Sequence, residues 1–132
     1  MAMQQVELGQ AFTIGPFTVD AEALRAYLAA TQGDASFYHR LDTVPQMVIA
    51  GRTLGALIER LAMPAGSIHM GQELEFVGTA KPGEQLTCHV KLARESKRAG
   101  WRIMGLDFVV AVGQRQVLTG KSTVMLPIQE GA

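Results

Sequence analysis

The feature that most constrains the fold is a change in the spacing of apolar residues near residue 66. Before it, a pattern that opens at Pro45 places apolar residues at helical spacing, until Pro64-Ala65-Gly66 ends it. The apolar positions of this predicted helix are Val48, Ile49, Leu54, Leu57, Ile58 and Leu61. After residue 66, apolar residues recur at every second position, which is typical of strands. The chain is therefore predicted to contain one long buried helix followed by a sheet.

Four alternating runs are predicted to be the strands of this sheet. They span residues 67–76, 86–92, 104–112 and 117–126, with turn-forming residues between them. The first run is predicted to be half-buried, with apolar residues on one face and polar residues on the other. The apolar face comprises Ile68, Met70, Leu74 and Phe76, and the polar face His69, Glu73 and Glu75. Short turns between four strands predict an antiparallel meander.

The N-terminal part adds a short strand over residues 12–17 and a helix that ends at about Thr31. Thr18 or Asp20 is the predicted N-cap of this helix. Together the elements predict an α+β architecture, in which a curved antiparallel sheet wraps around a central helix.

Length and charge exclude several classes of protein. The 132 residues fit one domain, 1–132, and 12 basic residues balance 12 acidic ones, so a nucleic-acid partner is not expected. No run approaches the roughly 20 apolar residues of a membrane span, and no N-terminal targeting pattern is present, so we expect a cytoplasmic chain without a membrane partner. Because 48% of the residues are apolar, part of the surface is expected to contact another subunit.

A carboxylate and an imidazole stand five residues apart where the first predicted helix ends. Residues 33–39 read Gly-Asp-Ala-Ser-Phe-Tyr-His, and Gly33 favours the positive φ that terminates helices. Asp34 and His39 are therefore a candidate acid/base pair on a turn. Taken alone, either side chain has an ordinary structural interpretation, Asp34 as a turn residue that accepts hydrogen bonds from nearby amides.

The pattern Gly-Asp-x-Ser-x-x-His resembles the Gly-Asp-x-Asn-Pro-x-His signature of the MaoC-like (R)-specific enoyl-thioester hydratases and 3-hydroxyacyl-thioester dehydratases. The likeness continues in residues 49–54 and 66–76 and covers most of the chain. Ser36 and Phe37 replace the usual Asn-Pro, Ala50 stands where a His often precedes the Gly, and the stretch between His39 and Gly51 is shorter than usual.

This resemblance implies the hot-dog fold, hydration of trans-2-enoyl thioesters to (R)-3-hydroxyacyl thioesters, and the reverse dehydration. It implies that Asp34 and His39 hold one water, that Ser36 supports the turn, and that the backbone N–H of Gly51, at the start of the central helix, binds the thioester oxygen. It also implies an acyl thioester of coenzyme A or of a carrier protein as substrate, without a further cofactor. Because hot-dog domains of this family pair through sheet edges, we expect a homodimer or larger homo-oligomer, or a pair with a second hot-dog subunit.

Two alternatives stay open. A hot-dog acyl-CoA thioesterase would use a carboxylate of the central helix to activate water, and Glu59 is the candidate. A non-catalytic hot-dog subunit that binds an acyl group would explain the replaced motif residues. Acyl length, carrier and physiological direction are not specified by the sequence.

No metal or nucleotide site is predicted. His69 and His89 fall on the polar faces of predicted strands without nearby ligands at metal-binding spacing, and Cys88 is the only cysteine, so no disulfide is expected. The glycine-containing stretches lack the phosphate-loop ending and the dinucleotide-binding pattern.

Overall fold

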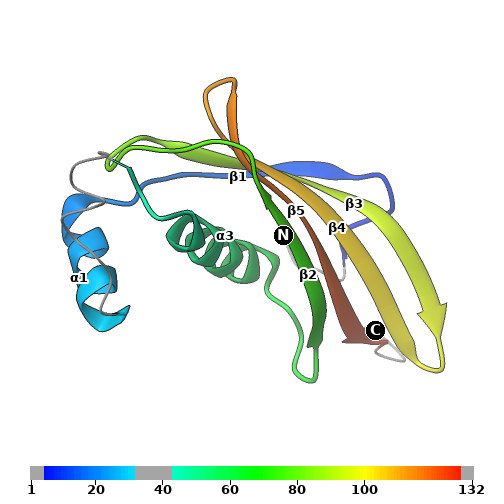
Figure 1. Ribbon diagram of the computed structural model, residues 1–132. Coiled ribbons are helices and arrows are strands. Elements are labelled where there is room, and N and C mark those ends of the chain that lie inside the picture. The colour runs from blue at the N-terminus through cyan, green and yellow to red at the C-terminus, as the bar shows by residue number, and fades with distance from the viewer. Residues whose placement is uncertain (1–4, 32–42, 129–132) are drawn as a thin grey trace.

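A computed structural model describes residues 5–31 and 43–128 of the chain. The elements, in chain order, are β1 (Ala11–Phe17), α1 (Ala21–Thr31), α3 (Gln46–Leu61), β2 (Ile68–Phe76), β3 (Leu86–Arg98), β4 (Trp101–Val112) and β5 (Arg115–Pro127). The strands form one curved antiparallel sheet, and α3 lies on its concave side with α1 beyond it (Figure 1). The predicted α+β architecture, a sheet wrapped around a central helix, is confirmed.

Strand order differs from the predicted meander at one step. The order in the sheet is β1-β3-β4-β5-β2, so the hairpins β3-β4 and β4-β5 are confirmed, whereas β2 pairs with β5 and not with β3. The alternation of apolar residues specifies which face of a strand is buried, but it does not specify which strand lies beside it. The connection between β2 and β3 therefore crosses the sheet.

The register of β2 corrects the predicted faces of its first residues. An irregularity between His69 and Gly71 interrupts the pairing with β5 and reverses the alternation there. His69 pairs with Val124, a residue of the buried face, but its side chain is exposed, as predicted, while Ile68, predicted to be on the buried face, is 48% exposed. Because β2 is an edge strand, Met70 and Phe76 are also exposed, at 54% and 37%, so the prediction that they are buried on the apolar face was wrong.

The core lies between α3 and the concave face of the sheet. Sheet residues of this face alternate along β4 as predicted, and Met104, Leu106, Phe108 and Val110 are fully buried. The helix contributes Val48, Ile49, Ala50, Thr53, Leu57 and Leu61. Of the predicted apolar positions, Ile58 is 53% exposed, because it lies on the flank of the helix instead of facing the sheet.

Residues near Gly78 fix the start of α3 against the sheet. The Val44 N–H donates to the Ala80 carbonyl at 2.8 Å, and Gln46 Nε2 donates to the Gly78 carbonyl at 3.1 Å. Gly78 itself crosses close to β5, since a Cβ added there would lie 2.4 Å from the backbone oxygen of Gln116. Only glycine allows this close approach of two backbones.

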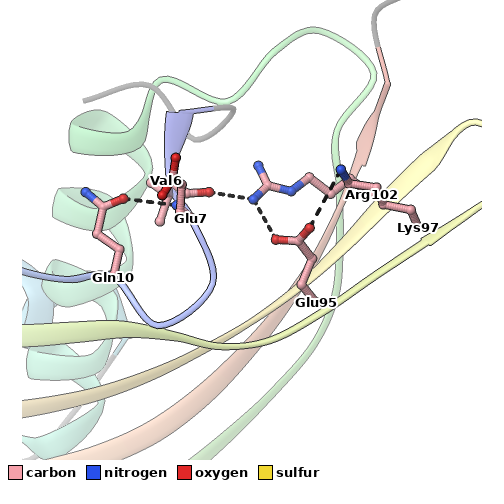
Figure 2. Close-up of polar contacts among 6 residues, drawn as sticks. All are labelled: Val6, Glu7, Gln10, Glu95, Lys97 and Arg102. Atoms are coloured by element: carbon pink, nitrogen blue, oxygen red, sulfur yellow. Dashed lines mark hydrogen bonds and ion pairs between the residues drawn. The ribbon is translucent and has the colours of Figure 1, made fainter.

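The N-terminal segment is held against the far end of the sheet by Arg102 (Figure 2). The Arg102 guanidinium donates from Nη2 to the Val6 carbonyl and, at 2.8 Å, to Glu95 Oε2. The Val6 side chain is buried in the core, and the Glu7 N–H donates to Gln10 Oε1 at 3.0 Å. The segment before β1 is thus part of the packed structure.

Helix α1 begins at a side-chain cap. Asp20 Oδ1 accepts the N–H of Ala23 at 2.7 Å, so Asp20, one of the two predicted residues, is the N-cap. Leu24 and Leu28 are buried in the core.

Candidate functional site

Three of the predicted site residues lie outside the described residues. Asp34, Ser36 and His39 belong to residues 32–42, which the structure does not describe, so their roles stay predictions. The structure describes the chain up to Thr31, the last residue of α1, and again from Thr43 onward. The predicted acid/base segment is therefore joined directly to the anchored start of α3.

Gly51 does not begin the central helix, which corrects the sequence analysis. The helix starts at Gln46 after Pro45, so Gly51 is well inside it, and in a regular helix its N–H donates to the carbonyl four residues earlier. The first-turn amides of Gln46 and Met47 have no acceptor among the described residues. The spacing of apolar residues placed the helix start at Pro45, which the structure confirms, whereas the family resemblance placed it at Gly51, which is wrong.

Gly51 nevertheless presents an open surface. It is exposed, and no other part of the described chain comes within 4 Å of the position that a Cβ would take. A glycine inside a helix costs about 0.5–1 kcal/mol relative to alanine. The described residues give no packing reason for glycine at Gly51, and the same holds for Gly55 in the same helix.

A narrow apolar pocket lies between α3 and the sheet, on the same side of the helix as Gly51. It encloses about 30 Å³, which is room for one or two water molecules. Its lining comprises Leu54, Leu57, Ile58, Leu61, Met63, His69, Leu106, Ser122 and Val124. His69, which sequence analysis assigned to the solvated face, is thus at the edge of this pocket.

Two polar side chains of the concave face, Ser122 in the pocket lining and Gln72 outside it, have no hydrogen-bond partner among the described residues. Ser122 is 1% exposed, and its Oγ is unpaired, as is the buried Nε2 of Gln72. The two residues are opposite each other in the register of β5 and β2, so both belong to the concave face. A buried polar group without a partner costs about 1–3 kcal/mol.

Sequence analysis missed this polar pair. A signal was available for Ser122, since it interrupts the apolar face of β5 between Leu118 and Val124. A signal was available for Gln72 too, because it stands two residues before Leu74 on the predicted apolar face, and the pairing from Gln72 to Phe76 is regular.

Other ionisable groups described do not form a second site. Burial raises the pKa of the Cys88 thiol to about 12, so this side chain is a core residue and is not a thiolate nucleophile near neutral pH. Within residues 5–31 and 43–128, no three His, Cys, Asp or Glu side chains gather as metal ligands. In the same residues, no helix has the length and apolarity needed to cross a bilayer.

Comparison with solved structures identifies the fold. The chain is similar to the (R)-hydratase from A. caviae involved in PHA biosynthesis, with 24% identity, a TM-score of 0.75, and coverage of 94% of this chain and 99% of that one. It is also similar to the MaoC-like dehydratase from Rhodospirillum rubrum, with 19% identity, a TM-score of 0.79 and 98% coverage of both chains. No protein-family model and no curated protein sequence matches the chain.

Further neighbours differ in activity and assembly. One is the HadBC complex from Mycobacterium tuberculosis, a 3R-hydroxyacyl-ACP dehydratase, with 15% identity, a TM-score of 0.70, and coverage of 89% of this chain and 96% of that one. Another is the fluoroacetyl-CoA-specific thioesterase FlK, also at 15% identity, with a TM-score of 0.66. The structural neighbours thus include MaoC-like hydratases alongside other hot-dog proteins, and the chain has the hot-dog fold.

Proposed function

We propose that the protein is a hydratase/dehydratase that interconverts trans-2-enoyl and (R)-3-hydroxyacyl thioesters. The observation that carries the proposal is the apolar pocket between α3 and the sheet. The Asp34/His39 segment comes immediately before the start of this helix in the chain. His39 is four residues before Thr43, so the length of the chain keeps their Cα atoms within about 14 Å of each other. The hydratases and dehydratases among the structural neighbours support this choice of reaction.

In the proposed reaction, Asp34 and His39 hold one water molecule between them. One of the pair takes a proton from the water as its oxygen bonds to C3 of the enoyl group, and a proton is delivered to C2. Negative charge develops on the thioester oxygen during the addition, and a backbone donor near Gly51 stabilises it. In the reverse direction, the same groups remove water from the 3-hydroxyacyl thioester. Ser36 orients the turn through its hydroxyl.

The acyl chain occupies the pocket between α3 and the sheet. The enclosed volume of about 30 Å³ holds only one or two water molecules, so an acyl group requires lining side chains such as Ile58 or Met63 to move aside. Hydration of crotonyl-CoA, followed as loss of absorbance of the enoyl thioester, is therefore the direct test of the proposal. Absence of turnover with short and long enoyl groups on both coenzyme A and carrier protein would contradict it.

The thioesterase alternative is weaker on the described geometry. Glu59, its candidate carboxylate, is exposed and does not line the pocket. Release of free coenzyme A from crotonyl-CoA or butyryl-CoA would nevertheless favour it over hydration. A non-catalytic acyl-binding subunit would bind these thioesters without turning them over.

Gly51→Ala is expected to raise stability and lower activity. Alanine removes the helix cost of glycine, so the free energy of unfolding should rise by about 0.5–1 kcal/mol. The added methyl group obstructs the approach of the thioester, and we expect kcat/KM for crotonyl-CoA to fall about tenfold. Gly55→Ala is the matched control, because Gly55 is also in α3 with open space around it. It should gain similar stability and keep its activity, and equal activities of the two variants would exclude Gly51 from the site.

We propose that a second hot-dog subunit, in the first instance another copy of this chain, pairs with the free edge of β2. Ile68 and Met70 are 48% and 54% exposed along this edge, and unpaired strand edges readily accept another strand. The HadBC neighbour is a complex of hot-dog chains, which supports such pairing.

The double substitution Ile68→Lys and Met70→Lys is expected to convert a dimer to a monomer, because like charges would face each other across the edge. Light scattering coupled to size-exclusion chromatography measures the mass. Leu8→Lys is the control, since Leu8 is 61% exposed but lies in the N-terminal segment. A double variant that remains dimeric would place the interface elsewhere.

A further inference from the structure

We propose that Ser122 and Gln72 select acyl groups that carry a neutral oxygen substituent, such as a ketone or hydroxyl, on the part of the chain beyond the reacting carbons. This inference rests on the proposed function for the presence of an acyl group in the pocket. It concerns a different part of the ligand from the one on which Asp34 and His39 act.

The placement of the pocket puts Ser122, which lines it, beside the distal part of the acyl group, and Gln72 is opposite Ser122 in the register of β2 and β5. Leu54 and Leu61, which line the pocket, follow Gly51 by three and ten residues in α3. At 1.5 Å per residue, they lie roughly 5 and 15 Å further along the helix axis. A thioester oxygen near Gly51 would therefore leave the end of a short acyl chain next to β5, where Ser122 lies.

The unpaired atoms define the chemistry of the group that fits. Gln72 Nε2 is a donor, and the Ser122 hydroxyl both donates and accepts, so a ketone or hydroxyl oxygen between them satisfies both side chains. A plain alkyl chain would fill the same space and leave both without a partner. An ionised group is disfavoured, because His69 is the only ionisable side chain among the lining residues and the rest of the lining, Ser122 apart, is apolar.

The state of Ser122 contrasts with that of the other fully buried polar residue described. Thr53 is also 1% exposed, but its Oγ1 donates to the Ile49 carbonyl at 2.8 Å. The hydroxyl of Thr53 is thus hydrogen-bonded within its own helix, whereas the hydroxyl of Ser122, which lines the pocket, has no partner among the described residues. Retaining an unpaired hydroxyl at a cost in stability is the pattern expected of a residue that serves a ligand.

The test compares saturated acyl-CoA esters, which bind without being hydrated. Isothermal titration calorimetry measures the Kd of hexanoyl-CoA and of its 4-oxo, 5-oxo and 6-hydroxy derivatives for the wild-type protein. We expect at least one oxygenated ester to bind about tenfold more tightly than hexanoyl-CoA, as two added hydrogen bonds would give. In Ser122→Ala, this preference should fall to about twofold or less, while the Kd of hexanoyl-CoA stays within about twofold.

Thermal unfolding without ligand supplies a second readout. Ser122→Ala should unfold at a higher temperature than the wild type, because it removes an unpaired buried hydroxyl. Thr53→Val, which removes a paired one, should show no such rise and should keep the preference for the oxygenated ester. If Ser122→Ala does not fold, Gln72→Met replaces it in the binding experiment and should also lose most of the preference.

The outcomes separate this inference from the proposed reaction. No preference for any oxygenated ester, a preference that survives Ser122→Ala, or a lower unfolding temperature of that variant would each overturn the inference, even if crotonyl-CoA is hydrated. A preference that depends on Ser122 in a protein that hydrates nothing would support the selective pocket and overturn only the catalytic proposal.

Discussion

Crotonyl-CoA hydration is expected to fall by a factor of about 10²–10⁴ in Asp34→Asn and in His39→Ala, which is the usual contribution of a positioned acid or base. Asp34→Asn keeps the size of the side chain but cannot take a proton from water. His39→Ala removes the partner that holds the same water molecule. Because the two residues act as a unit, the double variant should lose little more than either single variant. Steady-state rates at saturating and at low substrate concentration measure the effect.

Two variants control this experiment. His89→Ala removes an exposed histidine of β3 and should leave hydration unchanged. Ser36→Ala should lower the rate by about tenfold or less, because Ser36 is proposed to support the turn without contacting the water. Activity that survives in both Asp34→Asn and His39→Ala would exclude the pair as the acid and base, whatever the fold.

Gly78→Ala is expected to lower the free energy of unfolding by about 2 kcal/mol, because it forces two backbones apart. The new Cβ would lie 2.4 Å from the Gln116 oxygen, and a backbone atom cannot move aside as a flexible side chain can. We expect the unfolding temperature to fall by about 8 °C in a thermal scan. Since the Gly78 carbonyl accepts a hydrogen bond from Gln46, the start of α3 should shift as well, and kcat should fall with stability.

Gly55→Ala separates this effect from a general response to replacing glycine. Its position has no neighbour within 4 Å, so the same substitution should stabilise the protein there. A Gly78→Ala variant as stable as the wild type would mean that the strands can separate at this point without cost.

The helices and the faces of the central strands were predictable from sequence because their signals are local. Pro45, the helical spacing and Pro64-Ala65-Gly66 predicted α3 (Gln46–Leu61) to within a few residues. Alternation likewise predicted the buried face of β4, including Leu106 and Phe108. The helical spacing and the alternation both follow from which side chains of a single helix or strand face the core.

Features that depend on contacts between distant elements were not predictable in this way. The pairing of β2 with β5 requires a connection that crosses the sheet, and the irregularity at His69 leaves no trace in the alternation. The candidate site likewise has one part that could be predicted from sequence and one part that could not. The spacing of Asp34 and His39 is visible in the chain, whereas the approach of Gln72 to Ser122 exists only once two strands have paired.

The position of β2 at the edge of the sheet has a consequence for protein synthesis. Its partner strand β5 emerges from the ribosome only after β3 and β4, since Phe76 pairs with Leu118 and Ile68 with Met125. Until then, the apolar side chains and the backbone groups of β2 have no partner within the sheet, which makes such a segment prone to aggregation. Slow or interrupted translation between residues 77 and 115 should therefore lower the yield of folded protein more than a pause after residue 127.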